Sequence, residues 1–185
     1  MLSRIDEIVY PNRCEVIEIE ASHRYVYPIF KNGSTSIIEY AREQKLKTLI
    51  NTQITKLDVI DVILRDPLER FLSGFNTFVY NTKTENPELD LNTIIYFAET
   101  YLFLNRHYAP QLSWLENLSK YLGKNTKLRL LDMSAVSSYT PLTIRRKESM
   151  MLSDSDVVKL KESTHNDLYL KIDSLLLELV GQERS

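Results

Sequence analysis

The 185-residue sequence has few of the residues that mark a disulfide-linked, metal-binding or membrane-spanning protein. Its single cysteine, Cys14, excludes an internal disulfide, and the three histidines are too far apart to form a zinc-binding motif. No apolar run approaches the length of a bilayer span, and the first ten residues lack the hydrophobic core of a signal peptide. These absences predict a soluble, cytoplasmic protein with no metal site and no membrane partner.

An excess of charge of one sign is also absent. The sequence has 23 basic and 25 acidic residues, so no overall field favours nucleic acid as a partner, and an anion site would have to be local. There are only four glycines, and neither G-x-x-x-x-G-K-[ST] nor G-x-G-x-x-G occurs, which argues against an ordinary ATPase. The length and the 43% hydrophobic content suit one domain over residues 1–185, and nothing in the sequence indicates an oligomeric state.

Residues 25–40, YVYPIFKNGSTSIIEY, predict a strand, a tight turn and a helix in succession. The apolar run Tyr25 to Phe30 is typical of a buried strand, Lys31 to Gly33 of a turn, and Ser34 to Ser36 of a helix start. A helix start exposes backbone N–H groups and the positive end of the helix dipole, so three hydroxyls and an ammonium there suit a phosphate or sulfate. The alternative is that Ser34 only caps a helix after a glycine turn.

A second strand-to-helix junction follows. Leu57 to Leu64 is rich in Val and Ile and predicts a buried strand, after which Asp66 would cap a helix that begins at Pro67 and runs to about Tyr80. Arg65 would then lie at the carboxyl end of the strand, where ligands bind in parallel α/β sheets. The alternative places Arg65 in a surface ion pair and leaves Arg70 and Glu69 on a solvated face.

The rest of the sequence alternates strand and helix patterns, which predicts an α/β fold with parallel strands. Further strands are expected at residues 5–10, 15–20, 48–52 and 127–133. Further helices are expected at residues 36–47, 91–104, 112–122 and 167–180, with loops at 81–90 and 134–151.

Both junctions resemble motifs of the sulfotransferase family. Residues 31–36, KNGSTS, resemble the K-x-G-[ST]-[ST] loop that binds the 5′-phosphosulfate, and residues 65–73, RDPLERFLS, resemble the 3′-phosphate motif R-[DNH]-P-x-x-R-x-x-S. The resemblance is closest to carbohydrate sulfotransferases of the uronyl 2-O type. It implies a three-layer sandwich with a central parallel sheet, the P-loop nucleotide-kinase-like sulfotransferase fold.

The resemblance also implies an activity and a donor. A sulfotransferase would move a sulfuryl group from 3′-phosphoadenosine 5′-phosphosulfate (PAPS) to an acceptor hydroxyl, here expected on a carbohydrate, and would release adenosine 3′,5′-bisphosphate (PAP) without a metal. Lys31 would stabilise charge on the leaving phosphate, and Arg65 and Ser73 would bind the 3′-phosphate. The remaining residues implied to bind the nucleotide are Asn32, Gly33, Ser34, Thr35 and Ser36.

Two later segments extend the resemblance. Residues 105–111, NRHYAPQ, resemble an H-[WFY]-x-P-Q stretch, and Arg145 with Arg146 lies in a basic run that would cover the nucleotide or, alternatively, form a solvated turn. The sequence departs from the family in having no histidine between the two phosphate motifs, so His107 is the candidate general base. This departure leaves open a catalytically inactive nucleotide-binding or interaction module, and a small ATP-dependent phosphotransferase is a further alternative.

Overall fold

The computed structural model describes residues 14–19, 23–100 and 107–141, together with positions 153, 155, 158 and 171. The strand expected at residues 5–10 and the basic run with Arg145 and Arg146 therefore lie outside the described residues, as does the C-terminal helix apart from position 171. The elements in chain order are β1 (Glu15–Ile19), β2 (Arg24–Tyr27), α1 (Ser34–Glu43), β3 (Thr48–Ile50), the 3₁₀ helix η2 (Asn51–Lys56), β4 (Val59–Ile63), α2 (Pro67–Glu85), α3 (Leu91–Thr100), α4 (Gln111–Ser119), β5 (Lys127–Leu131) and the 3₁₀ helix η3 (Met133–Ser138).

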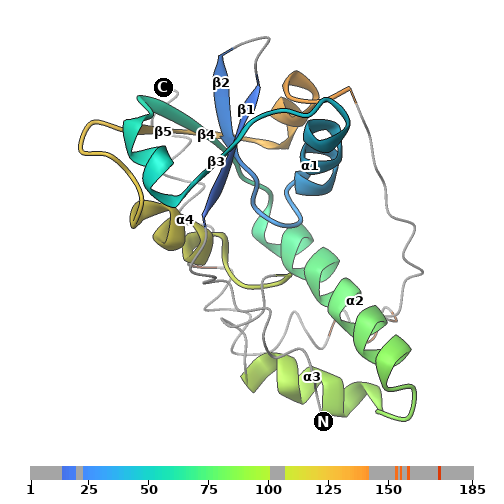
Figure 1. Cartoon of the computed structure of the whole chain (residues 1–185). Coiled ribbons are helices and arrows are strands. Elements are labelled where there is room, and N and C mark those ends of the chain that lie inside the picture. Colours follow the sequence, from blue (N-terminus) through green and yellow to red (C-terminus); the bar gives the residue numbers. More distant parts are fainter. Residues whose placement is uncertain are drawn as a thin grey trace.

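The described strands form a mixed sheet of five, in the order β3-β1-β2-β4-β5 (Figure 1). Strand β1 is antiparallel to both β2 and β3, whereas β2 is parallel to β4 and β4 to β5. Four of these strands therefore run in one direction, and β1 runs against them. The expected α/β fold with parallel strands is present in part: the pairs β2–β4 and β4–β5 are parallel, but the sheet is mixed because residues 20–23 are too short a connection for a parallel crossover from β1 to β2.

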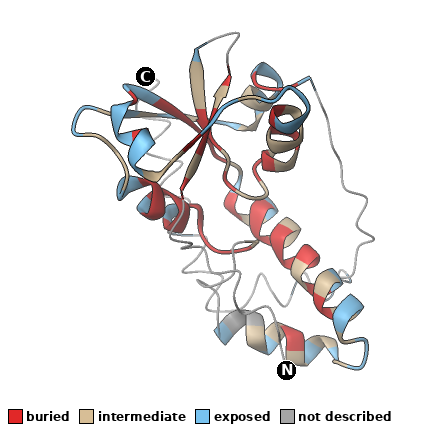
Figure 2. Ribbon diagram, in the orientation of Figure 1, coloured by how far each residue is buried: buried red, intermediate tan, exposed pale blue. Residues whose placement is uncertain are grey.

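Helices cover the two faces of this sheet from different parts of the chain. On one face, strand residues such as Val16, Tyr27 and Val62 pack against Ile54 of η2 and Leu118 of α4. On the other face, the strand residues Ile17, Ile19, Val26 and Ile63 pack with residues of α1 and with Tyr139, which follows η3. The buried residues accordingly follow the strands and the inner sides of the helices (Figure 2).

Helix α2 extends away from the sheet, and α3 lies beside its far end (Figure 1). Phe71, Phe75 and Val79 of α2 form a buried cluster with Ile94 of α3 and with Tyr108. Helix α2 continues to Glu85, so the predicted loop over residues 81–90 was wrong in its first half. In residues 81–85 only Thr82 is buried, and polar side chains on the solvent side are compatible with a helix.

Most of the other predicted elements are present with shifted ends. The expected strands at residues 48–52 and 127–133 are β3 and β5, and the helix expected at 112–122 is α4. Helix α3 matches the start of the helix expected at 91–104, of which residues 101–106 lie outside the described part. The first residues of the loop expected at 134–151 belong to the 3₁₀ helix η3, which ends at Ser138. Within the described residues, no helix combines the length and apolar character needed to cross a bilayer.

Candidate functional site

After β2 and after β4 the chain turns to opposite faces of the sheet, and the edge where these two strands end is called the switch point below. These two strands are parallel neighbours, so their carboxyl ends meet at one edge. The chain leaves β2 for α1 on one face, and it leaves β4 for α2 and then α4, which packs on the other face. Ligands of α/β sheets bind at such switch points, and Lys31 and Arg65 both lie here.

The turn after β2 is held in an unusual backbone conformation. Lys31 has φ 71° and Gly33 has φ 75°, both in the left-handed region. Gly33 is the N-cap of α1, and no side chain provides a cap hydrogen bond. The alternative in which Ser34 caps the helix was therefore wrong, because Ser34 is already the first helical residue.

The start of α1 is closely packed by η3. A Cβ atom at Gly33 would lie 2.8 Å from Cγ2 of Val136, so the room left by the missing side chain is taken by Val136. Of the three predicted anion-binding hydroxyls, those of Ser34 and Ser36 belong to buried residues, while Thr35 is half-buried. Thr35 is thus the most accessible hydroxyl of this first turn.

Lys31 contacts both neighbouring elements. Its backbone carbonyl accepts a hydrogen bond from Nη1 of Arg65, with 3.1 Å between the two atoms, and its ammonium donates to the hydroxyl of Thr77 on α2. The Thr77 hydroxyl in turn donates to the carbonyl of Ser73, at 3.1 Å. The ammonium predicted at the start of α1 therefore lies beside α2, near the half-buried Ser73.

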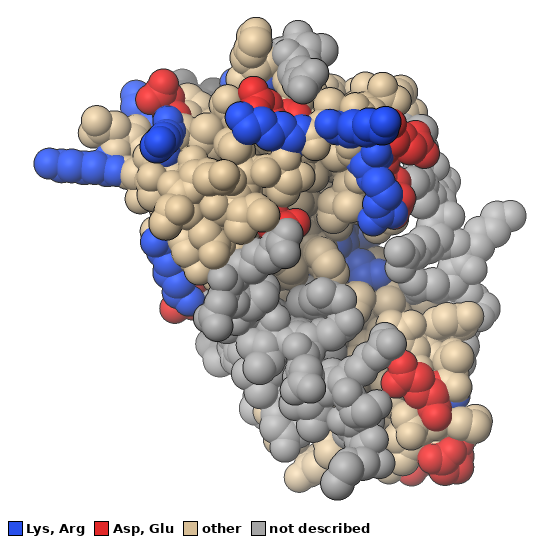
Figure 3. All heavy atoms as spheres, viewed as in Figure 1, with Lys and Arg blue, Asp and Glu red and all other residues tan. Residues whose placement is uncertain are grey.

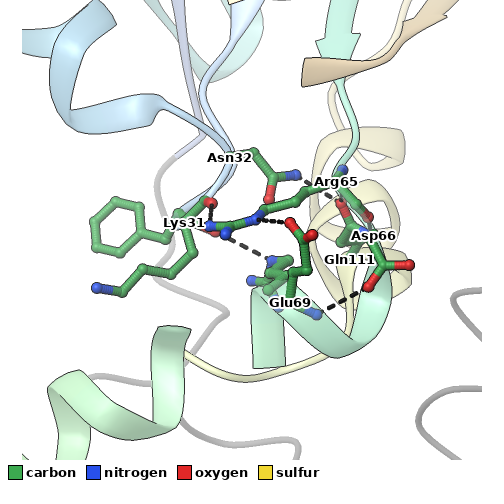
Figure 4. A network of polar contacts seen from close by, with 8 residues as sticks. Lys31, Asn32, Arg65, Asp66, Glu69 and Gln111 are labelled. Atoms are coloured by element: carbon green, nitrogen blue, oxygen red, sulfur yellow. Dashed lines mark hydrogen bonds and ion pairs between the residues drawn. The ribbon is translucent and has the colours of Figure 1, made fainter. Parts of the chain in front are cut away.

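The two arginines of the second motif have different environments. Arg65 is half-buried, and its Nε lies 3.4 Å from a carboxylate oxygen of Glu69, whose side chain is 67% exposed (Figure 4). Arg70 is fully buried; its Nε donates to the carbonyl of Phe30 at 3.1 Å, and its Nη1 donates to the carbonyl of Ala109. The alternative that put Arg70 on a solvated face was wrong, because Arg70 joins the β2 turn to the segment before α4.

Helix α2 begins as predicted. Oδ1 of Asp66 accepts a hydrogen bond from the backbone N–H of Glu69 at 2.9 Å, and Pro67 is the first helical residue. Pro lacks the N–H that would otherwise need a partner at this position, and its φ suits the first turn. The cap and the helix start predicted at Asp66 and Pro67 are therefore confirmed.

Two buried amides connect the turn after β2 to the end of β4. Asn32, 1% exposed, donates through Nδ2 to the carbonyl of Ile63 at 2.8 Å and to Oε1 of Gln111 at 2.6 Å. Gln111, fully buried, also accepts from the backbone N–H of Arg65 at 2.9 Å and donates to the Arg65 carbonyl at 3.0 Å (Figure 4). The sequence singled out Gln111 only as part of a family-like stretch and gave no sign of this role.

The ring of His107 contacts the ring of Phe30, which lies just before the turn that follows β2. Its ring centroid is 5.9 Å from that of Phe30, and the Phe30 ring stacks on Trp114 at 5.2 Å with 27° between the planes. The backbone of His107 packs so closely on α2 that a Cβ at Gly74 would overlap the His107 carbonyl. The candidate base is therefore held next to the residue that precedes Lys31.

Three other groups that could exchange protons, Asp61, Tyr139 and Cys14, are buried in the structure. Asp61 in β4 is buried and binds Arg129 through both carboxylate oxygens, at 2.6 and 2.7 Å, and it accepts from the hydroxyl of Tyr139. Burial, together with the hydrogen bond to Asp61, raises the pKa of Tyr139 to about 12. Burial likewise raises the pKa of the Cys14 thiol to about 12, so neither group is a base at neutral pH.

Charged side chains of both signs lie on the described part of the surface. On the face in Figure 3, basic and acidic side chains are mixed over the sheet region, and basic atoms lie in a recess between this region and the part that holds α2 and α3. Among the described residues, no group of three or more His, Cys, Asp or Glu side chains could hold a metal ion. The predicted nucleotide residues Arg145 and Arg146 lie outside the described residues.

The structure thus brings together Lys31, Asn32, Arg65 and the start of α1, with Ser73 on the adjoining helix. This arrangement offers backbone N–H groups, hydroxyls and a guanidinium at one edge of the sheet, which are the donors that phosphate and sulfate groups prefer. No family model matches the chain, and searches of curated proteins and of solved structures find no similar protein.

Proposed function

We propose that this chain is a sulfotransferase that uses PAPS as the sulfuryl donor and the hydroxyl of an acceptor, expected to be a carbohydrate, as the nucleophile. The observation that carries the proposal is the hydrogen bond from Arg65 to the carbonyl of Lys31. This bond joins the two loops whose sequences resemble the two phosphate motifs, and it does so at the switch point of the sheet.

Each loop has groups suited to one end of the donor. The start of α1 would bind the 5′-phosphosulfate through backbone N–H groups of its first turn and the hydroxyl of Thr35. The guanidinium of Arg65 can fork two oxygens of a 3′-phosphate, and Ser73 lies two turns along α2 to donate to the same group.

The transfer would break the bond between sulfur and the bridging phosphate oxygen while the acceptor oxygen forms a new bond to sulfur. The bridging electron pair stays on the phosphate of PAP, and the acceptor proton passes to a general base, for which His107 is the candidate. Lys31 would stabilise the growing negative charge after its ammonium turns from Thr77 toward the start of α1.

The arrangement of the sheet supports the finer fold assignment. Strands β3, β2, β4 and β5 run in one direction, and helices pack on both faces, as expected of a three-layer sandwich related to the P-loop nucleotide kinases. The antiparallel β1, which lies between β3 and β2, departs from that plan.

The first test is calorimetric titration of the full chain with PAP, with adenosine 5′-monophosphate, and with ATP plus magnesium. We expect PAP to bind about a hundredfold more tightly than the monophosphate, and Arg65→Ala to lose most of this preference because the 3′-phosphate loses its forked partner. The matched control is Arg42→Ala, which removes an exposed arginine from α1 that pairs with Glu39.

The titrations separate the alternatives. Equal affinity of the wild type for PAP and the monophosphate would refute the proposal, and tight magnesium-dependent binding of ATP alone would favour a phosphotransferase. Binding of PAP without sulfuryl transfer to any of a panel of glycans would refute the expected carbohydrate acceptor and favour an inactive nucleotide-binding module.

A further inference from the structure

We propose that Gln111 is a positioning residue that locks the two loops together, so that the sites for the two phosphates are held at a fixed separation. The inference rests on the proposed function and extends it to a residue that binds no part of the donor itself. Gln111 is the first residue of α4, and its side chain lies between the turn after β2 and the end of β4 (Figure 4).

The Gln111 amide pairs with the backbone of Arg65 as another peptide group would. Its Oε1 accepts from the Arg65 N–H at 2.9 Å, and its Nε2 donates to the Arg65 carbonyl at 3.0 Å. Two antiparallel bonds to one residue restrict both the position and the rotation of that residue's backbone. The base of the Arg65 side chain is thereby fixed relative to α4.

Oε1 of Gln111 also bonds to the other loop, the turn after β2. It accepts from Nδ2 of Asn32 at 2.6 Å, and Asn32 donates in addition to the carbonyl of Ile63. Asn32 is the middle residue of the turn that leads into α1, so its position determines where the first turn of α1 begins. A single side-chain oxygen therefore connects the backbone N–H of Arg65 in one motif to the side chain of Asn32 in the other.

Burial makes this connection costly to disturb. Asn32 is 1% exposed and Gln111 is 0% exposed, so water cannot readily replace a lost partner. A glutamate would keep the accepting oxygen but lose the donor to the Arg65 carbonyl, and an asparagine would be too short to reach both loops. The site requires one acceptor and one donor at the length of glutamine.

A fixed separation matters because the donor is bound at two points. When two sites are held at the right separation, the second phosphate binds to a site that is already in place, and its binding adds to that of the first. If the loops move independently, each phosphate still binds singly, but part of this gain is lost. Replacing Gln111 should therefore weaken the cooperation between the two phosphates, meaning the extra affinity gained when both are on one nucleotide, more than it weakens the binding of a nucleotide with a single phosphate.

The test compares Gln111→Met with Asn117→Leu in the full chain. Both replacements exchange a buried amide of α4 for an apolar group of similar size, but Asn117 bonds to Tyr27 of β2, whereas Gln111 bonds to Asn32 and Arg65 of the two loops. Dissociation constants are measured for PAP, adenosine 3′-monophosphate, adenosine 5′-monophosphate and adenosine. The product of the two monophosphate constants, divided by the product of the PAP and adenosine constants, measures the cooperation between the phosphates.

We expect this ratio to fall by about tenfold in Gln111→Met and to stay at the wild-type value in Asn117→Leu, even if both variants unfold at lower temperature. Hydrogen exchange at the Arg65 amide provides a readout without ligand, and it should accelerate only in Gln111→Met. An unchanged ratio in Gln111→Met, or unchanged exchange at Arg65, would overturn the inference while leaving the proposed function standing. A wild type with no preference for PAP would remove the proposed function and this inference together.

Discussion

Helices α1 and α2 begin at neighbouring positions, directly after two parallel strands, yet their first turns differ in charge. The N-cap of α1 is Gly33, with no side-chain acceptor and no acidic residue in the first turn. Helix α2 has the carboxylate of Asp66 as its cap and Glu69 in its first turn. The positive end of α2 is thus neutralised within the chain, and that of α1 is not.

This difference indicates how each loop would hold an anion. At α1 the helix start itself is suited to a phosphate, since its N–H groups receive no capping carboxylate. At α2 the helix start is already occupied, so an anion there must be held by side chains such as Arg65 and Ser73. Two phosphates of one nucleotide would therefore be bound by different physical means.

The largest expected effect is on PAP binding, and it comes from placing an acidic residue in the first turn of α1, as Glu69 is in the first turn of α2. Thr35→Glu places a carboxylate in the half-buried second position of α1, where its repulsion should weaken PAP binding by about a hundredfold while the helix dipole keeps the fold intact. The control is Gln44→Glu, which adds the same charge at the other end of α1. Equal effects of the two changes on the dissociation constant would show that the start of α1 is not an anion site.

A smaller effect is expected from altering the backbone at the start of α1. Gly33→Ala must accommodate φ 75° and a methyl group 2.8 Å from Val136, which should lower the free energy of unfolding by about 2 kcal/mol in urea denaturation. In a Val136→Ala background the steric part should disappear and the part due to φ should remain. An alanine at position 33 that leaves stability unchanged would contradict the described turn.

The smallest effect is expected from removing the cap of α2. Asp66→Ala should cost about 1 kcal/mol of stability, because the N–H of Glu69 loses its acceptor. Asp58→Ala removes the same charge from an exposed position before β4 and should cost less than about 0.5 kcal/mol. Thermal unfolding of both variants measures the difference, and equal costs would mean that Asp66 contributes only through its charge.

The sequence predicted the local order of the site well because that order depends on neighbouring residues. The apolar runs of β2 and β4, the glycine turn and the Asp-Pro helix start are each visible within a few positions. The direction of β1 could also have been inferred, since the connection before β2 is short. The end of α2 was missed because a polar run on a solvated helix looks like a loop.

The contacts that assemble the site could not be read from the sequence. Gln111 bonds to Arg65 across 46 positions and to Asn32 across 79, and no local pattern encodes such pairings. One interpretation of the sequence left Arg70 on a solvated face with Glu69, and only the packed structure shows its guanidinium bonded to two backbone carbonyls. Buried polar side chains acquire their roles from distant partners, which a single sequence does not identify.

The stacking of Trp114 on Phe30 provides the chain with its own optical probe. The sequence contains one tryptophan, and its ring lies against the residue directly before Lys31. Indole emission depends on the polarity and motion of its surroundings, so any displacement of this turn changes the only tryptophan signal that the protein emits. Rearrangement of the loop can therefore be followed in time by stopped-flow fluorescence, without a label or a substitution.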